Sequence, residues 1–215
     1  MWSDTFQTKE MLDKVRDGDN GARDDLLRQH REPLRRMISL RLDPAIAARL
    51  DASDVVQEVM LEASRRLDDY LKNPAMPFPL WLRHIAKDHI IDAHRRHRLA
   101  QRRGVDREQP MVPAALAGHS SAELAAQFMD HEKTPASAAI EHEMQRRIQL
   151  AIVNLEEADR EIILMRHFEQ MANQEVALAL GLTEAAASMR YLRAVRRLRE
   201  QLNPGAESDK DEIVD

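Results

Sequence analysis

Cysteine is absent from this chain of 215 residues, and several other residue types are scarce. Without cysteine there is no disulfide, no thiolate zinc site and no cysteine nucleophile. The chain holds only 6 glycines, and aromatic residues make up 4% of it. This scarcity, together with abundant Ala, Leu, Arg and Glu, predicts an all-α protein.

Long apolar segments are missing too. No run of about eighteen apolar residues exists, so we expect no transmembrane helix and no membrane insertion. The N-terminal segment MWSDTFQTKEM carries acids and lacks the basic-then-apolar pattern of an export signal. Together these features predict a cytoplasmic location.

Charge is segregated along the chain, whose formal net charge is −5. The segment after Pro204, GAESDKDEIVD, has five acids and one lysine. Between Trp81 and Arg103, seven Lys or Arg stand against two Asp. A local basic face is what phosphates encounter, so the acidic total does not exclude a nucleic-acid partner.

A helix-turn-helix pattern lies near the C-terminal end. A short helical run, Asn173–Leu180, is followed by a break and a longer run, Glu184–Arg199. In the break, Gly181 can close a helix in the left-handed conformation, and Thr183 is a good N-cap. The second run has an apolar stripe of Ala187, Tyr191, Ala194, Val195 and Leu198, and its remaining surface carries Ser188, Arg190, Arg193, Arg196, Arg197 and Arg199. This pattern suits a DNA major groove, and the alternative is an ordinary amphipathic hairpin with a solvated arginine face.

A second basic helix is expected from Leu80-Trp81-Leu82 to about Arg98. It follows the proline-rich segment Lys72–Pro79, which we expect to be non-helical. Its buried stripe is predicted at Leu82, Ile85, Ala86, Ile90 (or His89) and Ala93. An aromatic side chain at the head of a basic helix suits single-stranded nucleic acid, although core packing is the favoured interpretation for the Trp81 ring.

The sequence pattern favours neither a metal site nor an enzyme. Four histidines lie in the basic helix at His84, His89, His94 and His97, without the i, i+4 spacing of helical zinc sites and amid positive charge. No nucleophile–base arrangement or glycine-rich phosphate loop is found. We therefore predict no catalytic site, no metal, no cofactor and no small-molecule substrate.

An amphipathic helix is predicted after Asp51, which can act as its N-cap. Its inward positions are Ala52, Val55, Val56, Val59, Ala63 and Leu67, and its outward positions are Asp54, Gln57, Glu58, Glu62 and Arg65. The outward face is either solvated or a docking surface for a basic or polar partner helix.

The remaining segments complete an all-α fold of two helical domains joined by a flexible linker. Helices are expected at about Thr8–Val15 and Ala22–Leu42, the second interrupted or bent at Pro33, and a turn at Asp43-Pro44. Further helices are expected from Thr134-Pro135 to Val153 and, capped by Asn154, over Leu155–Phe168. The predicted domains are 1–104 and 135–203, with a linker at 105–134 and an acidic disordered tail at 204–215. The linker has room for one short helix after a capping box at Ser120 and Glu123.

These motifs together resemble a known family. Asp51-Ala52-Ser53-Asp54-Val55-Val56-Gln57-Glu58-Val59 resembles the D-A-E-D-L-V-Q-E-V signature of bacterial sigma factors of the extracytoplasmic-function type. Trp81-Leu82-Arg83-His84-Ile85-Ala86, followed by Asp92 and Arg95-Arg96, resembles their promoter-melting helix. Asn154 through Leu198 resembles their C-terminal domain, including Arg160-Glu161 and Gln174-Glu175-Val176-Ala177. The matches cover most of residues 20–202, in the order that the family has.

The resemblance implies an initiation factor that binds core RNA polymerase and directs it to promoter DNA. It implies a polymerase-binding set of Asp51, Asp54, Gln57, Glu58 and Glu62. It implies that Trp81, Arg83, Lys87, Asp88, Arg95 and Arg96 recognise and open the −10 element. The −35 element would be read by Thr183, Ser188, Met189, Arg190, Leu192, Arg193, Arg196 and Arg197. Whether an anti-sigma partner exists stays open at this point.

The sequence departs from the family pattern at some of these positions. Many members have Asn where this chain has Asp88, a carboxylate that cannot donate to a flipped base and repels phosphate. Pro is usual where Glu156 stands, and Glu also suits the first turn of a helix. Ser188-Met189-Arg190 replaces a frequent Lys-Ser-Arg, so Met189 offers apolar contact only.

The main alternative function is a conventional helix-turn-helix transcriptional regulator with an N-terminal helical partner-binding or sensor domain. Such a regulator needs only the C-terminal domain to bind duplex DNA. It would leave the basic segment from Trp81 to Arg103 without an explanation.

Overall fold

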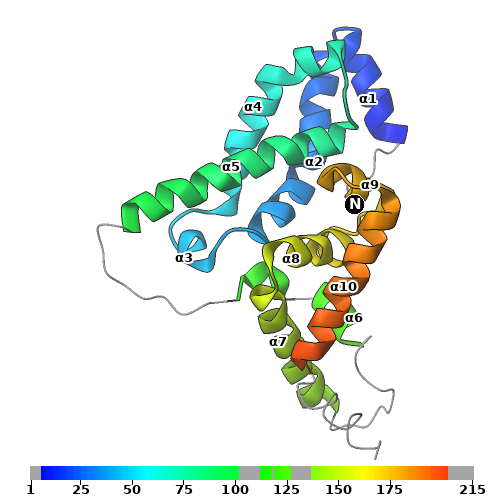
Figure 1. Ribbon diagram of the computed structural model, residues 1–215. Coiled ribbons are helices and arrows are strands. Elements are labelled where there is room, and N and C mark those ends of the chain that lie inside the picture. Colours follow the sequence, from blue (N-terminus) through cyan, green and yellow to red (C-terminus); the bar gives the residue numbers. More distant parts are fainter. Residues whose placement is uncertain (1–5, 102–111, 118, 127–136, 203–215) are drawn as a thin grey trace, which may run out of the picture. The chain divides into compact units, whose positions relative to one another are not determined.

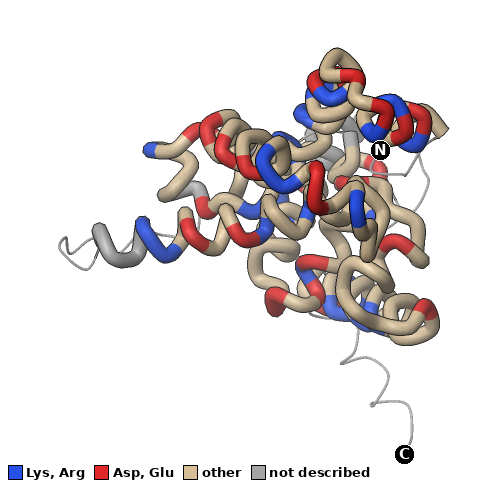
Figure 2. The backbone as a smooth tube through the Cα atoms, turned by 90° about the horizontal axis from the view of Figure 1, so that it is seen from above, with Lys and Arg blue, Asp and Glu red and all other residues tan. Residues whose placement is uncertain are grey.

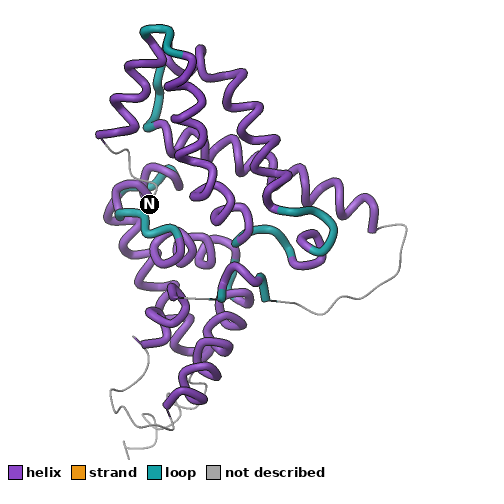
Figure 3. Tube along the Cα trace, turned by 180° about the vertical axis from the view of Figure 1, so that it is seen from behind, coloured by secondary structure: helices purple, strands orange, loops and turns teal. Residues whose placement is uncertain are grey.

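The computed structural model describes residues 6–101, 112–117, 119–126 and 137–202. Within these ranges every regular element is helical (Figure 3), which confirms the all-α prediction. The chain divides into two compact units: the N-terminal unit, Met1–Ala115, and the C-terminal unit, Leu116–Asp215.

The described residues of the N-terminal unit form three long helices and two shorter ones, which are labelled in Figure 1. They are α1 (Phe6–Arg16), α2 (Asn20–Ser39), α3 (Pro44–Ala47), α4 (Ala52–Lys72) and α5 (Phe78–Gln101). Helices α2, α4 and α5 pack against one another, α1 lies against α2, and α3 contacts α5. The largest fully buried side chains of this core are Phe78, Leu26, Leu34, Met37, Ile38, Leu42, Leu67 and Leu82. Burying each apolar side chain stabilises the fold by about 1.5–3 kcal/mol.

Helix α4 forms where the sequence predicts it. The Asp51 carboxylate accepts a hydrogen bond of 2.7 Å from the Ser53 N–H, as an N-cap does. The predicted inward positions Val55, Val56, Val59, Ala63 and Leu67 are all buried, whereas Ala52 is half-buried. Five buried positions on one stripe fix which face of α4 is turned to solvent.

Helix α2 begins and ends earlier than predicted, and Pro33 does not interrupt it. Asp19 caps it, accepting from Gly21 N at 2.8 Å and Ala22 N at 3.1 Å, so α2 begins before Ala22. The helix continues across Pro33 and ends at Ser39. Proline removes one backbone donor, and burial of Leu26 and Leu34 on either side holds the helix together across that gap. The turn expected at Asp43-Pro44 instead leads directly into α3.

The connection between α4 and α5 is shorter than predicted. Residues 73–77 are non-helical, but α5 begins at Phe78 and includes Pro79. A proline is tolerated in the first turn of a helix because its missing N–H would have no intrahelical partner there. The predicted buried stripe of α5 is correct, with Ile90 rather than His89 as its fully buried member.

The C-terminal unit contains α6 (His119–Ala126), α7 (Ser137–Asn154), α8 (Glu157–Ile163), the π-helix η2 (Leu164–Phe168), α9 (Asn173–Leu180) and α10 (Glu184–Leu202). A short 3₁₀ turn, η1 (Ala114–Leu116), precedes them. Helix α10 packs against α7, α8 and α9, and α6 packs against α7 and η2 (Figure 1). Packing against these three helices fixes the position of α10 within the C-terminal unit.

The segment predicted as a linker contains packed structure. The expected short helix is present as α6, although it begins at His119, one residue before its expected cap. Leu116 and Leu124 are buried, and the Ser121 hydroxyl donates to the Leu116 carbonyl. Because these side chains are buried, the compact C-terminal unit begins at Leu116, whereas the sequence placed the start of that domain at 135. The predicted helix start at Thr134-Pro135 and the acidic tail lie outside the described residues.

The helix predicted over Leu155–Phe168 is wrong in two respects. Helix α7 extends through Asn154, so Asn154 is not an N-cap, and α8 starts at Glu157 after Glu156. The second half is a π-helix, in which each turn holds about one extra residue. Hydrophobic periodicity does not distinguish a single π turn from an α-helix, so the π-helix could not be predicted from the sequence pattern.

Candidate nucleic-acid interface

The turn between α9 and α10 has the geometry that its sequence predicts. Gly181 closes α9 at φ +63°, in the left-handed region. The Leu182 N–H donates to the Ala177 carbonyl at 2.8 Å, and the Gly181 N–H donates to the Leu178 carbonyl at 3.3 Å. This pair of bonds is the Schellman motif. Thr183 then caps α10, its hydroxyl oxygen accepting from the Ala186 N–H at 3.2 Å.

A side-chain bond also joins the starts of the two helices. Asn173, the first residue of α9, donates through Nδ2 to the Glu184 carbonyl at 3.0 Å. Within α9, the Glu175 carboxylate accepts from the Ala172 N–H at 2.7 Å. The Glu175 bond caps the start of α9, and the Asn173 bond fixes α9 relative to α10, as a helix-turn-helix reader requires.

Helix α10 presents a mixed basic and apolar surface. Its buried positions are Ala187, Ala194, Leu198 and Leu202, and the predicted stripe residues Tyr191 and Val195 are half-buried. Met189 and Leu192 are 57% and 58% exposed. The other predicted DNA-binding residues Thr183, Ser188, Arg193 and Arg196 are exposed, and Arg190 is half-buried. This surface has donors for guanine and phosphate, and apolar groups for thymine methyls.

Arg197 has a different environment from the other arginines of α10. Its guanidinium pairs with Glu156 at 3.2 Å and with Asp159, a buried residue at the start of α8. The hydrogen bond to Asp159 raises the pKa of Arg197 above its ordinary value. Arg197 therefore holds α10 against α8, and its contact with DNA stays a prediction. Asp159 lies 38 positions away, so local sequence rules do not predict the pair.

Tyr191 is held by two residues of the π-helix. His167 Nε2 lies 2.9 Å from the Tyr191 hydroxyl, and the Arg166 guanidinium lies over the Tyr191 ring at 5.6 Å. Arg166 also donates to the Met171 carbonyl at 2.9 Å. Burial lowers the pKa of His167, so its neutral ring can accept from the hydroxyl. The His167–Tyr191 contact joins residues 24 positions apart, so local sequence rules do not predict it, and it orients α10 at its middle.

The exposed face of α5 carries most of the predicted −10 residues. Lys87, Asp88, Arg95 and Arg96 are exposed. Arg83 is only 6% exposed, so its predicted place on the DNA-facing surface is wrong. The reason is its spacing, because Arg83 precedes Ala86 by three residues and Ile90 by seven and so falls beside the buried stripe.

Trp81 belongs to an aromatic cluster at the start of α5. Its ring stacks on Tyr70 with a centroid distance of 4.7 Å and lies 5.5 Å from Phe78. Phe78 also contacts Tyr70 at 5.6 Å and His30 at 5.3 Å, edge to face. Trp81 is half-buried, which agrees with the packing interpretation and leaves part of the ring accessible. The cluster fixes the start of the basic helix.

The exposed face of α4 carries the predicted polymerase-binding residues. Asp51, Asp54, Gln57 and Glu58 are exposed, and Glu62 is half-buried. Glu62 pairs with Arg66 at 2.6 Å and with Arg65 at 3.8 Å. Leu61, on the same face, is 55% exposed, so the surface is not purely polar. Within single helices, acidic and basic positions lie close to one another (Figure 2).

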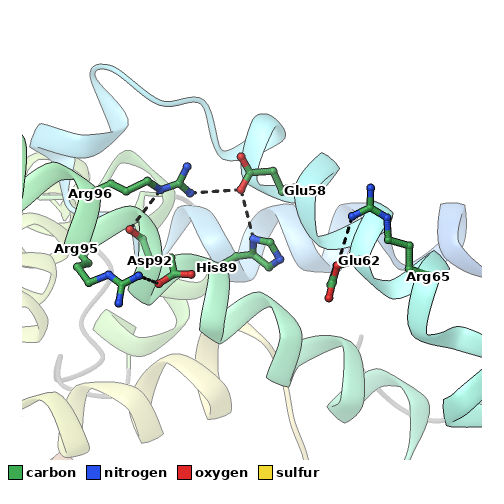
Figure 4. A network of polar contacts seen from close by, with 7 residues as sticks. All are labelled: Glu58, Glu62, Arg65, His89, Asp92, Arg95 and Arg96. Atoms are coloured by element: carbon green, nitrogen blue, oxygen red, sulfur yellow. Dashed lines mark hydrogen bonds and ion pairs between the residues drawn. The ribbon is translucent and has the colours of Figure 1, made fainter.

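One carboxylate joins the exposed faces of α4 and α5 (Figure 4). Glu58 Oε2 lies 3.3 Å from His89 Nδ1 and 3.4 Å from Arg96 Nη2. Arg96 Nε also donates to the Asp92 carbonyl at 3.4 Å, and the Asp92 carboxylate pairs with Arg95 at 3.2 Å. A predicted polymerase-binding residue thus contacts a predicted promoter-binding residue.

The histidines and acids of the described segments do not gather into a metal-binding group of three or more. His89 contacts Glu58, and His94 Nε2 lies 3.1 Å from the Arg41 carbonyl. In the same ranges, no helix is both long and apolar enough to span a lipid bilayer.

Two sequence families match this chain. Residues 26–100 match Sigma-70 region 2, and residues 145–198 match Sigma-70, region 4. The first match covers most of α2 and all of α4, with nearly all of α5, and the second covers the C-terminal part of α7 through most of α10. The matches therefore include both exposed faces of the N-terminal unit and the helix-turn-helix.

The chain is also similar to individual proteins. It is 30% identical over 162 residues to the RNA polymerase sigma factor CnrH of Cupriavidus metallidurans, covering 73% of this chain and 76% of CnrH. It is 28% identical over 185 residues to the ECF RNA polymerase sigma factor SigD of Mycobacterium tuberculosis, covering 86% and 79%. The chain is 32% identical over 165 residues to the probable RNA polymerase sigma factor RfaY of Xanthomonas campestris. The match covers 77% of this chain but only 36% of RfaY.

A solved structure shares the fold. It is that of CnrH in complex with the cytosolic domain of CnrY, with a TM-score of 0.58 and 22% sequence identity. The alignment covers 93% of this chain and 99% of that chain.

Proposed function

The chain belongs to the RNA polymerase sigma factors of the extracytoplasmic-function type, and from this premise we propose how its two units divide the work. The protein is a sigma factor that binds core RNA polymerase and directs transcription initiation at promoters. In the proposed division, α4 docks on the polymerase, α5 recognises and opens the −10 element, and α10 reads the −35 element. The observation that carries the proposal is the presence of three exposed faces of the expected chemistry on the two matched regions.

The conventional regulator, the main alternative, accounts for only one of these matches. Such a protein needs a helix-turn-helix alone, whereas residues 26–100 match Sigma-70 region 2 in addition. A sigma factor also needs no catalytic site, because the chemistry of RNA synthesis belongs to the polymerase. We therefore propose a non-enzymatic protein, placed in the cytoplasm because core polymerase and the chromosome are there.

The docking face on α4 is proposed to comprise Asp51, Asp54, Gln57, Glu58 and Glu62. Replacing Asp54 and Glu58 by Arg reverses two exposed charges, which usually changes the free energy of unfolding by about half a kcal/mol or less. We expect binding to core polymerase, measured by co-purification, to fall sharply while thermal stability stays nearly constant. Asp17→Arg with Asp24→Arg is the charge-matched control, on exposed acids away from α4. Equal loss in the control and the test variant would mean that only net charge matters.

The DNA-binding faces are proposed to act at different steps. Arg193 on α10 can contact a base edge in the major groove, a contact worth about 1–3 kcal/mol of discrimination. Arg193→Ala should lower transcription from a promoter with an intact −35 element and flatten the response to mutations in that element. Arg146→Ala, an exposed arginine of α7, should change neither.

Arg95 and Arg96 lie at the far end of α5. Replacing both by Ala should leave duplex promoter binding by the holoenzyme intact and reduce permanganate-reactive thymines near the start site. If the arginine variants of α5 and α10 lost duplex binding in parallel, with opening unaffected, the separate roles of the two helices would be excluded.

An anti-sigma partner is part of the proposal. CnrH is bound to the cytosolic domain of CnrY in the solved structure that shares this fold. The mixed apolar and basic surface around Met189 and Leu192 on α10 supports a protein partner in addition to DNA. Co-purification of the tagged chain from its own host tests this, and recovery of core polymerase alone would argue against it.

A further inference from the structure

If the proposed function holds, Glu58 contacts core polymerase in the complex and contacts α5 in the unbound protein. The structure shows the contact with α5. Glu58 is a member of the proposed docking face on α4, yet its carboxylate is engaged by Arg96 and His89 of α5 (Figure 4). Arg96 is a member of the proposed promoter-binding set. A single oxygen, Oε2, serves both contacts.

The contacts of Glu58 are of the kind that a partner can displace. Charge-assisted bonds between nitrogen and carboxylate oxygen are usually 2.7–2.9 Å long, whereas these measure 3.3 and 3.4 Å. The side chains of Glu58 and Arg96 are 45% and 60% exposed, so neither is held by burial. A cationic group of the polymerase approaching α4 can therefore take over the carboxylate.

The two arginines at the end of α5 differ in where their acidic partners lie. Arg95 pairs with Asp92 of its own helix, which is not in the proposed docking face. Arg96 pairs with Glu58 of α4, and Glu58 belongs to the proposed docking face. Docking on the polymerase would remove the partner of Arg96 and leave that of Arg95 in place.

We propose that Glu58 is a positioning residue that holds Arg96 away from DNA in the unbound protein and releases it when core polymerase docks. An arginine paired with a carboxylate has its charge partly neutralised and its donors occupied, so its attraction for phosphate is reduced. Polymerase docking and the Arg96–DNA contact are therefore coupled, and each favours the other. This inference rests on the proposed roles of α4 and α5.

The test uses the full chain without polymerase and a short fluorescein-labelled single-stranded DNA of mixed sequence. Glu58→Gln keeps the shape of the side chain and removes its charge. We expect affinity, measured by fluorescence anisotropy, to rise about two- to fivefold, the range that an exposed ion pair is worth. The logarithm of affinity should also fall more steeply with the logarithm of salt concentration, by about 0.7, because one more cation meets phosphate.

Two control variants separate release of Arg96 from a general change in charge. Asp24→Asn removes the same charge from an exposed acid of α2 that belongs to none of the proposed binding faces. It should leave the salt slope unchanged. Asp92→Asn releases Arg95, so its gain should persist when saturating core polymerase is present, whereas the gain from Glu58→Gln should vanish.

Failure of the coupling can be told apart from failure of the proposed function. If Arg96→Gln does not weaken binding of promoter DNA by the holoenzyme, Arg96 is not a promoter contact and its proposed role is wrong. If Arg96→Gln weakens that binding but Glu58→Gln matches Asp24→Asn in the assay without polymerase, the coupling alone is overturned. A gain from Glu58→Gln that survives in the Arg96→Gln background would overturn it as well.

Discussion

His30 makes the stability of the N-terminal unit depend on pH. Its ring is 3% exposed and packs edge to face on Phe78, and its buried Nε2 has no hydrogen-bond partner among the residues that the structure describes. Burial lowers the pKa of His30 from 6.5 to about 4. Because the folded pKa is depressed, the unfolded chain binds this proton first as the pH falls. The stability that neutral His30 allows is complete above about pH 6.5 and is lost progressively down to about pH 4.

The size of the effect follows from the two pKa values. One pKa unit corresponds to about 1.4 kcal/mol, so the full difference is on the order of 3 kcal/mol, of which about 2 kcal/mol is lost by pH 5. A His30→Leu variant cannot titrate at this position and also removes the unpaired Nε2. We expect it to be at least as stable as the parent near pH 7.5 and about 2 kcal/mol more stable than the parent at pH 5.

Urea unfolding followed by tryptophan fluorescence measures this difference, because Trp81 lies in the same aromatic cluster. His84→Gln, on an exposed residue of α5, is the control and should follow the parent at both pH values. If the parent and His30→Leu lose equal stability between pH 7.5 and pH 5, His30 is not buried in the neutral form and the reasoning fails.

Two further predictions concern the C-terminal unit. Gly181→Ala should destabilise it by about 1 kcal/mol, because no atom lies within 4 Å of an added Cβ and the cost is the left-handed backbone alone; Gly181→Asn should cost less. Hydrogen exchange of α9 and α10 measures this, and equal exchange in the Ala and Asn variants would contradict it. Arg197→Ala should lower the melting temperature more than Asp159→Asn, because Asp159 is buried and would keep an unpaired charge, whereas Arg197 can be hydrated. The reverse order in calorimetry would refute this assignment.

The local features of the fold were predictable because they depend on residues close in the sequence. Asp51 as a cap, Gly181 as a left-handed helix end and the buried stripe of α4 follow from rules that span a few residues. The same rules failed at Asn154, where α7 continues, and at Phe78-Pro79, where α5 starts early. There the burial of neighbouring side chains outweighs local preference.

The polar contacts between helices were not predictable. The Glu58–His89 contact joins residues 31 positions apart, and the Arg197–Asp159 contact joins residues 38 positions apart. Both depend on how two helices are rotated against each other, which the sequence pattern leaves undetermined. Two arginines predicted to contact DNA therefore also contact carboxylates of other helices. Arg197 holds α10 in place through Asp159, and Arg96 is paired with Glu58.

Transcription with purified components shows directly whether this chain brings core RNA polymerase to promoters. Core RNA polymerase from the protein's own host is incubated with fragmented host DNA, with and without the chain, and the 5′ ends of the transcripts are mapped. We expect discrete start sites that appear only with the chain present and share two upstream sequence elements. Fewer transcripts should start at these sites with the Arg193→Ala variant. Transcripts that are identical with and without the chain, although the chain still binds duplex DNA by itself, would contradict this expectation.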